Sequence, residues 1–364
     1  MSRRRREPIG MLAPLGWLYL GLASLHHGLY DRGLRRVETL PIPVISVGNL
    51  VAGGSGKTPT VAWLCTQLTQ RGYRVGIVSR GHGGRRDEDP LLVARAGHLF
   101  ASAAQAGDEA VQLARSSPAE VVVVGIDRVA AARLAQGEGA ELIVLDDGFQ
   151  HRRLDRSLNL LLLDAEKPFG SGRGLPAGPL REPLRGLRRA EMILLTRATP
   201  ELFSQPQPLA MEALPETLCR ALRSLSLAHR LPVFSARHSP RVLRDPSGTR
   251  CALTCLEKTR VLAVSGIARP EDFERSLRHL GARVVAHLAR SDHHAYDSRD
   301  SAEILRLSGK YRAKMIVTTA KDAERWPSEA PKPHVLEIAL DLSAPEAFLT
   351  TIAAHLPVPA GGSR

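Results

Sequence analysis

Short apolar runs alternate with amphipathic stretches through the first half of the chain. The apolar runs, each short enough for a buried strand, occupy residues 43–49, 74–81, 120–125, 141–148, 158–165 and 190–197. Stretches with helical spacing of apolar residues lie between several of them, at residues 59–72, 107–117 and 128–139. Apolar strands that alternate with helices are typical of a parallel sheet covered on both faces. The pattern therefore predicts an α/β fold.

The pattern changes near residue 200. Residues 232–243 and 250–255 predict shorter, antiparallel strands. The succession of strand, loop and helix then resumes at residues 260–281 and continues to about residue 340. We therefore expect a second, smaller α/β lobe. The domain boundaries that follow from these changes are 1–38, 39–200 and 201–364.

An apolar run near the N-terminus has basic residues on both sides. It covers residues 9–25, follows the arginines at residues 3–6, and precedes His26, His27 and several arginines. The run lies at the lower limit of the roughly 20 apolar residues that a membrane-spanning helix needs. Its flanking charge is typical of a helix at an anionic membrane surface. We therefore predict a membrane-associated N-terminal helix that lies on the bilayer or spans it; a buried first helix of the globular fold is the alternative.

Composition restricts the partners. The chain of 364 residues has 50 Lys and Arg against 37 Asp and Glu, a formal net charge of +13, which favours an anionic partner. Aromatic residues make up 4% and the arginines are spread along the chain, which argues against nucleic-acid binding. Cys251 and Cys255 are the one close cysteine pair in the sequence, and without a second pair they indicate buried thiols rather than a metal site.

A glycine-rich loop follows the first predicted strand of the core. Gly56, Lys57 and Thr58 match the end of the P-loop pattern G-x-x-x-x-G-K-[ST], although Val51 replaces its first glycine. In such a loop the backbone N–H groups cradle a phosphate, the lysine neutralises phosphate charge, and the hydroxyl residue holds Mg²⁺. The loop therefore predicts a nucleotide whose phosphates bind together with Mg²⁺. The predicted nucleotide-binding residues of the loop are Gly53, Gly54, Ser55, Gly56, Lys57 and Thr58.

Two carboxylates follow another predicted strand. Asp146 and Asp147 come directly after the apolar residues 142–145, in the manner of a Walker B sequence. Ligands bind at the carboxyl ends of strands in open α/β sheets, so both aspartates, together with Thr58, are candidate Mg²⁺ ligands. Asp108 opens a predicted helix at the same sheet edge. Its position fits a helix cap and a catalytic carboxylate equally well.

A histidine pair, His293 and His294, lies in the sequence RSDHHAY of residues 290–296. No matching set of metal ligands lies near it in the sequence. A general base, or the partner of one, suits phosphoryl transfer to a hydroxyl. A capped loop with one buried histidine is the alternative, and spacing alone leaves both open.

The succession of motifs resembles the tetraacyldisaccharide 4′-kinase family of lipid A biosynthesis. The motifs follow the family's order over nearly the whole chain, from SVGNLVAGGSGKTP at residues 46–59 to TTAKD at residues 318–322. The motifs between them are SRGHGG, GDEA, VGIDR, LDDGFQH, LPAGPLREP, VSGIARPEDF and SDHHAY. The family's P-loop also lacks the first glycine, whereas His82 stands where the family more often has Tyr. Such a series is far more specific than a P-loop alone.

The resemblance implies an enzyme that uses MgATP to phosphorylate the 4′-hydroxyl of a membrane-embedded tetraacylated glucosamine disaccharide 1-phosphate. It implies Asp108 as the catalytic base, paired with His293 in preference to His294. Arg128 would stabilise charge on the transferred phosphate. The remaining implied roles are ATP and Mg²⁺ binding for Lys57 and Thr58, metal binding for Asp146, orientation of metal or nucleotide for Gln150, and substrate positioning for Arg181 and Glu182.

The resemblance also implies a location and partners. It places the protein at the cytoplasmic face of the inner membrane, as a monomer whose partners are the lipid disaccharide monophosphate and the lipid surface. A membrane-associated regulatory or partitioning P-loop ATPase is the alternative. Such proteins need no acceptor site, whereas the LPAGPLREP and DHH segments indicate one, so these segments argue against the alternative. The predicted fold is a P-loop NTPase-like parallel sheet with a second, smaller α/β lobe and an N-terminal membrane-associated helix.

Overall fold

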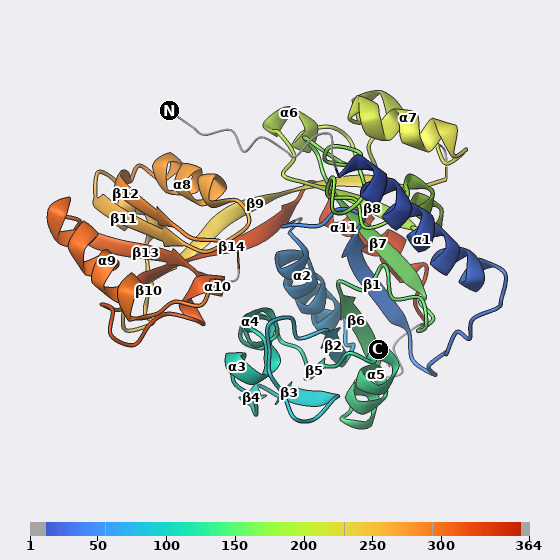
Figure 1. Ribbon diagram of the computed structural model, residues 1–364, viewed down its shortest axis with the longest axis horizontal. Helices are drawn as coiled ribbons and strands as arrows, with labels where there is room; N and C mark the ends of the chain where they lie inside the picture. Colours follow the sequence, from blue (N-terminus) through green and yellow to red (C-terminus); the bar gives the residue numbers. More distant parts are fainter. Residues whose placement is uncertain (1–11, 55, 229, 293, 358–364) are drawn as a thin grey trace.

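A computed structural model shows that the protein has two lobes that share one sheet (Figure 1). The structure describes residues 12–54, 56–228, 230–292 and 294–357. Ser55 and His293, which the sequence assigns to the nucleotide and to the catalytic base, lie outside the described residues. The same holds for the basic residues 3–6 and the first residues of the apolar run.

The first lobe is built on a parallel sheet whose strands are buried along their whole length, which explains the continuous apolar runs. The parallel strands are β1 (Val44–Asn49), β2 (Val75–Ser79), β5 (Val121–Val124), β6 (Leu142–Asp146), β7 (Leu158–Asp164) and β8 (Met192–Thr196). An edge hairpin consists of β3 (Leu91–Arg95) and β4 (His98–Leu99). The accompanying helices are α2 (Lys57–Gln70), α3 (Ala103–Ala106), α4 (Asp108–Ser116), α5 (Arg128–Gly137), α6 (Pro200–Phe203) and α7 (Glu216–Ser224).

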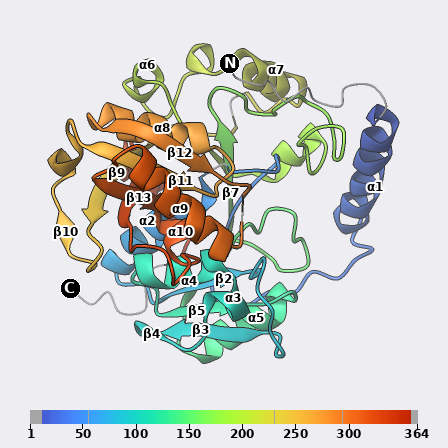
Figure 2. The same cartoon turned by 60° about the vertical axis from the view of Figure 1, so that its left-hand side comes forward.

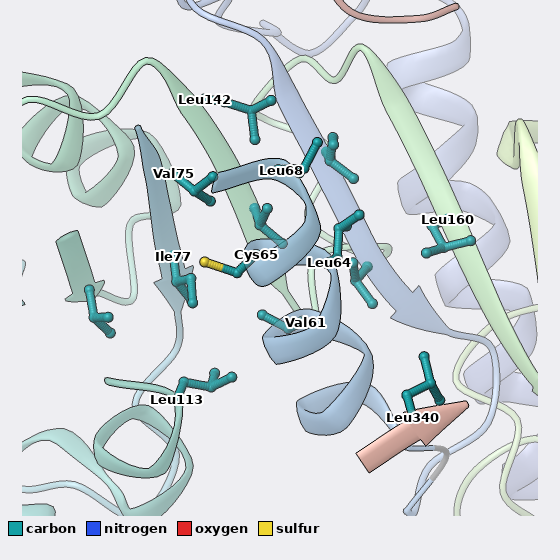
Figure 3. Packing of buried hydrophobic residues seen from close by; sticks show 14 of the residues in the cluster. Val61, Leu64, Cys65, Leu68, Val75, Ile77, Leu113, Leu142, Leu160 and Leu340 are labelled. Carbon is teal, nitrogen blue, oxygen red and sulfur yellow. The ribbon is translucent and has the colours of Figure 1, made fainter. Parts of the chain in front are cut away.

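The largest core cluster lies between α2 and the sheet. Val61, Leu64 and Leu68 recur at helical spacing on α2 and are fully or almost fully buried against strand residues such as Ile77 (Figure 3). The apolar face of α2 therefore fixes the helix whose first turn carries the P-loop lysine.

The second lobe is a smaller α/β unit. Its elements are β10 (Arg250–Cys251), β11 (Arg260–Ser265), α8 (Pro270–His279), β12 (Arg283–Ala289), α9 (Ser298–Lys310), β13 (Met315–Thr319) and α10 (Ala320–Ala323). Strands β11, β12 and β13 are parallel. Phe273 and Leu277 on α8 pack against Val261 and Ala263 of β11, so this lobe has a core of its own.

Two long strands join the lobes, β9 (Val233–Arg244) and β14 (His334–Leu342). The beginning of β9 pairs in parallel with β8, and the rest of β9 pairs antiparallel with β14, which in turn pairs with β13. The complete strand order is β12-β11-β13-β14-β9-β8-β7-β1-β6-β2-β5-β3-β4. In Figure 1 this antiparallel pair runs from the first lobe into the second.

The structure confirms the α/β class, the parallel sheet around the P-loop and the second α/β lobe. Most of the strand predicted at residues 232–243 pairs antiparallel with β14 and β10, as expected. The strand is longer than predicted, with 12 residues, because both lobes share it. The boundary at residue 200 stays a prediction. However, α7 and the last helix, α11 (Pro345–Ala353), pack on core clusters of the first lobe.

The N-terminal helix α1 (Ala13–Asp31) lies on the outside of the first lobe (Figure 2). Gly16 is buried where α1 meets the loop that contains Gly174, and a Cβ on Gly16 would lie 2.9 Å from the Gly174 carbonyl oxygen. The opposite part of the helix exposes large apolar side chains: Leu15, Trp17, Leu18, Leu22 and Leu25. Within the described ranges, no helix combines the length and apolar character needed to cross a bilayer. Membrane association of α1 stays a prediction.

Gly48 tests how closely the loop after β6 packs on β1. A Cβ at Gly48 would lie 2.6 Å from the Phe149 Cβ and 2.8 Å from its backbone nitrogen, so Gly48→Ala should destabilise the fold by about 1–3 kcal/mol. Gly137→Ala is the matched control, because this helical glycine has open space around its Cβ position; it should stabilise by ~0.4–1 kcal/mol. Urea denaturation measures both, and a Gly48→Ala protein as stable as the wild type would contradict the packing.

Candidate active site

The P-loop lies between β1 and α2. Gly53 and Gly56 have φ angles of 116° and 80°, which glycine adopts without strain, and α2 begins at Lys57. The first turn of α2 thus presents unpaired backbone N–H groups and the positive end of the helix dipole to the cleft. This is the arrangement that binds phosphate.

A cleft of about 1890 Å³ lies between the two lobes. Its lining contains predicted residues from several elements of the first lobe, among them Gly53, Gly54, Gly56, Lys57, Thr58, Arg128, Asp146, Asp147, Gln150 and Arg181. The second lobe contributes the opposite wall, including Arg269, Asp272, Asp292 and Lys321. The structure therefore brings most of the predicted site residues to one cavity.

Asp147 connects the P-loop to the loop that contains Arg181. Its carboxylate accepts two hydrogen bonds of 2.8 Å from Arg181 and lies 3.7 Å from the Lys57 ammonium. Burial opposes ionisation, but Lys57 and Arg181 lower the pKa of Asp147 below its ordinary value. Its backbone is left-handed, with φ 54°, which turns the chain sharply after β6. Asp147 is thus a charged group at the entrance of the cleft.

Asp146 lies deeper, with 2% of its surface exposed. Its Oδ2 accepts a hydrogen bond of 3.2 Å from Ser79, whereas its Oδ1 has no hydrogen-bond partner in the described residues. Burial, together with the nearby Glu109 and Asp147 carboxylates, raises the pKa of Asp146 well above its ordinary value. Such a carboxylate has room for, and gains stability from, a cation.

The donor set fits Mg²⁺ shared with a nucleotide. No group of three or more His, Cys, Asp or Glu side chains suited to a metal occurs in the described residues. Mg²⁺ nevertheless needs few protein ligands, because it binds through one or two carboxylates plus phosphate oxygens and water. Asp146, Asp147 and the Thr58 hydroxyl line the same cleft as the phosphate loop. These residues would hold the ion between the protein and the phosphates.

Glu182 is buried rather than exposed to the cleft, with 1% of its surface accessible. Its carboxylate accepts hydrogen bonds of 2.9 and 2.7 Å from Arg189 and of 2.9 Å from the Gln150 amide. Gln150 also donates to the Asn49 carbonyl at 2.8 Å. Any effect of Glu182 on a substrate therefore passes through Gln150, which does line the cleft.

His27 corrects one reading of the N-terminus. The sequence suggests a basic flank of a membrane helix, but His27 is 7% exposed and its Nε2 lies 3.4 Å from the Glu182 carboxylate. Burial and the nearby Arg189 guanidinium lower the pKa of His27 to about 3, so the imidazole is neutral at neutral pH. His27 therefore packs beside Glu182 as a buried, neutral side chain instead of carrying charge to a membrane.

Arg128 is the first residue of α5 and is 6% exposed. Its Nη1 donates a hydrogen bond of 2.7 Å to the Gly125 carbonyl, and its Nε has no hydrogen-bond partner in the described residues. Burial and the nearby Arg80 lower the pKa of Arg128 to about 10, which still leaves it charged at neutral pH. A buried cation beside the aspartates and the P-loop is suited to developing negative charge.

Asp108 is the first residue of α4, is 5% exposed, and lies 3.4 Å from the Nε of Arg325. It does not line the cleft, whereas its neighbour Glu109 does. His294, the second candidate partner, contacts Asp300 at 2.7 Å and is engaged in the second lobe's own network. Because His293 lies outside the described residues, the pairing of Asp108 with His293 stays a prediction.

Several polar residues at the cleft were not predicted from the sequence. Arg197, after β8, contacts the Gly54 carbonyl and the Asp164 carboxylate. His238 on β9 packs against Gly56 of the P-loop, and burial lowers its pKa to about 4. Lys321 lies 3.2 Å from Glu109. Asp164 and Arg197 follow predicted strands, and ligands bind at the carboxyl ends of strands in such sheets. These positions could therefore have predicted both residues as part of the site.

A phosphate loop on a buried strand, paired carboxylates on the neighbouring strand and a deep interlobe cleft define a P-loop nucleotide-dependent phosphotransferase. Comparison with known proteins makes this class specific. The model of the tetraacyldisaccharide-1-P 4′-kinase family matches residues 9–357. The chain belongs to this family.

Individual relatives agree with the family match. The tetraacyldisaccharide 4′-kinase of Syntrophus aciditrophicus is 41% identical over 324 residues, 88% of this chain and 85% of the relative. That of Anaeromyxobacter sp. strain Fw109-5 is 42% identical over 337 residues, 91% and 87% of the two chains. The crystal structure of the "apo" form of LpxK from Aquifex aeolicus in complex with ATP is similar with a TM-score of 0.75 and 31% identity, over 95% of this chain and 98% of that one.

The buried Glu182 network gives a stability prediction. Glu182→Leu leaves the Arg189 guanidinium without its carboxylate partner and should cost about 3 kcal/mol of unfolding free energy. The matched control is Glu216→Leu, which breaks an exposed ion pair with Arg220 and should cost less than about 1 kcal/mol. Urea denaturation measures both variants. Equal losses would mean that the Glu182 network contributes no more than a surface pair.

Proposed function

We propose that this chain transfers the γ-phosphoryl group of ATP to the 4′-hydroxyl of tetraacyldisaccharide 1-phosphate, a step of lipid A biosynthesis. Family membership over nearly the whole chain is the observation that carries the proposal. The site adds physical support, because the P-loop, the paired aspartates and Arg181 line one cleft.

The nucleotide would bind with its phosphates on the P-loop. Gly53, Gly54 and Gly56 allow the backbone to approach the phosphates, and Lys57 supplies a cation 3.7 Å from Asp147. Thr58, Asp146 and Asp147 would hold Mg²⁺, which neutralises phosphate charge when bound. Arg197 holds the loop by its contact with the Gly54 carbonyl.

The chemical step needs a proton acceptor for the sugar hydroxyl. The 4′-oxygen forms a bond to the γ-phosphorus while the bond between that phosphorus and the β–γ bridging oxygen breaks, and ADP leaves. We assign the departing hydroxyl proton to Asp108, with His293 as its partner. Arg128 and Lys57 stabilise the charge on the transferred group. Gln150, held by Glu182, and Arg181 position the sugar.

The lipid substrate requires a route from the bilayer, and α1 provides it. Exposed apolar side chains on α1, together with the net charge of +13, suit attachment to an anionic membrane at its cytoplasmic face. His27 of this helix packs beside Glu182, which adjoins Arg181 in the chain. We therefore propose a monomer that lies on the inner membrane and receives its acceptor beside α1.

The proposed activity is tested by the P-loop lysine. Purified protein with MgATP and the lipid disaccharide monophosphate should give a product that is heavier by one phosphoryl group. Lys57→Ala should lower the turnover by several orders of magnitude, because phosphate clamps act mainly in the transition state. The protein should stay folded, since Arg181 still pairs with Asp147. Near-normal turnover of a folded Lys57→Ala protein would remove the P-loop from the mechanism.

Membrane attachment through α1 is tested with vesicles that contain anionic phosphatidylglycerol. The double variant Leu18→Glu, Leu22→Glu should reduce vesicle co-sedimentation at least about tenfold, since burial of each leucine contributes about 1.5–3 kcal/mol. The control is Leu305→Glu on α9, where a leucine is exposed to a similar extent, 52% against 60% for Leu18. Equal binding of all three proteins would place the attachment elsewhere.

A further inference from the structure

The two lobes meet beside the proposed base. Helix α10 and the turn after it pack on the first turns of α4, where α4 and α10 are neighbours (Figure 2). Two ion pairs cross this boundary near Asp108: Arg325 Nε lies 3.4 Å from Asp108 Oδ2, and Lys321 Nζ lies 3.2 Å from Glu109 Oε1. A third, between Arg115 and Glu324 at 2.7 Å, is more exposed. Asp108 is therefore paired with a cation from the other lobe.

Arg325 is held firmly on the second lobe. Its Nη2 donates to the Asp322 carboxylate at 2.8 Å and approaches the Gly266 carbonyl at 3.4 Å. Asp322 is fully buried and also accepts hydrogen bonds from the Gly266 backbone and the Thr319 hydroxyl. The Nε and Nη1 of Arg325 donate no hydrogen bond to any residue that the structure describes. The guanidinium is thus fixed through Nη2, while its Nε, which lies near Asp108, has no hydrogen-bond acceptor in the described residues.

We propose that Arg325 is a positioning residue for the proton acceptor: its guanidinium orients the Asp108 carboxylate and keeps it ionised while the lobes are together. The inference rests on the proposed role of Asp108. Arg325 is assigned to act through Asp108, because its contacts in the described residues are with Asp108, Asp322 and the Gly266 carbonyl.

The charges around Asp108 explain why it needs such a partner. A carboxylate that is 5% exposed is disfavoured in its charged form unless a cation is close. From the second lobe, Lys321 and Arg325 face it with positive charge and Glu324 with negative charge, and Glu109 adjoins it on α4. Lys321 already has Glu109 and Asp292 as partners at 3.2 and 3.0 Å. Arg325 is the cation whose ion pair with Asp108 the structure shows directly.

Rigid orientation matters as much as charge. A general base must point at the proton it accepts, and an ion pair with a fixed guanidinium favours carboxylate orientations that keep Oδ2 near Nε. Because Arg325 belongs to the second lobe, its contact with Asp108 exists only when α10 lies against α4. The proton acceptor is then assembled in the closed arrangement of the lobes, which also excludes water.

The test compares Arg325→Met and Arg325→Lys with the wild type in the lipid kinase assay. Arg325→Met should lower kcat roughly 10- to 100-fold and leave the KM for ATP within about twofold, as expected for a group that acts on general-base catalysis. Removing the cation favours protonated Asp108, so the acid limb of the pH–kcat profile should shift to higher pH. Arg325→Lys should recover part of the rate. Arg115→Met, which breaks the exposed pair of the same boundary, is the control and should stay within about twofold.

Combination with Asp108→Asn distinguishes this inference from the proposed function. If Asp108→Asn turns over normally, the assignment of the base itself fails. If Asp108→Asn is inactive and Arg325→Met behaves like the wild type, Asp108 is the base and the inference about Arg325 is wrong. In the Asp108→Asn background, Arg325→Met should cause little further loss; losses that multiply would show that Arg325 acts independently of Asp108. If Arg325→Met does not fold, Arg325→Gln, which keeps a polar side chain without the charge, takes its place, and a kcat and a pH–kcat profile equal to those of the wild type overturn the inference.

Discussion

The structure depends on placing two adjacent carboxylates at the end of a buried strand. Asp146 is buried and has one oxygen without a hydrogen-bond partner in the described residues, while Asp147 is balanced by Lys57 and Arg181. This concentration of negative charge beside a helix N-terminus is stable only with cations close by. Lys57 of the P-loop supplies one cation, and Arg181 supplies another. In the proposed function the same charge would hold Mg²⁺ beside the nucleotide phosphates.

The second lobe provides the wall of the cleft that lies opposite the P-loop. Strands β9 and β14 extend the sheet beyond the first lobe and carry a wall of the cleft with them. After β14 the chain returns to the first lobe, where α11 packs on the core cluster that contains α2. As a result the lobes are connected by paired strands rather than by a loose linker, and contacts such as Arg325 with Asp108 can form reproducibly across their boundary.

Local features of the sequence were sufficient for part of this architecture. The P-loop and the carboxylates after β6 lie within a few residues of the elements that position them, so strand and helix periodicity predicts their place. Arg325 could not be found in this way, because its partner Asp108 is more than 200 residues away and only tertiary pairing joins them. For the same reason His27 resembled a membrane flank although it is buried against Glu182. The length of β9 and its sharing between the lobes were not predicted, because its first residues pair with β8 and the rest pairs with β14, which is distant in the sequence.

The central claim is that the cleft delivers the γ-phosphoryl group to one hydroxyl of a lipid disaccharide and not to water. The most direct measurement is phosphorus NMR of the lipid recovered after incubation with the full chain and MgATP, with proton correlation to locate the new phosphate. We expect a single new phosphomonoester on the 4′-oxygen, formed in equal amount to the ADP released. Release of ADP with free phosphate and an unchanged lipid, or phosphate at another hydroxyl, would contradict the account.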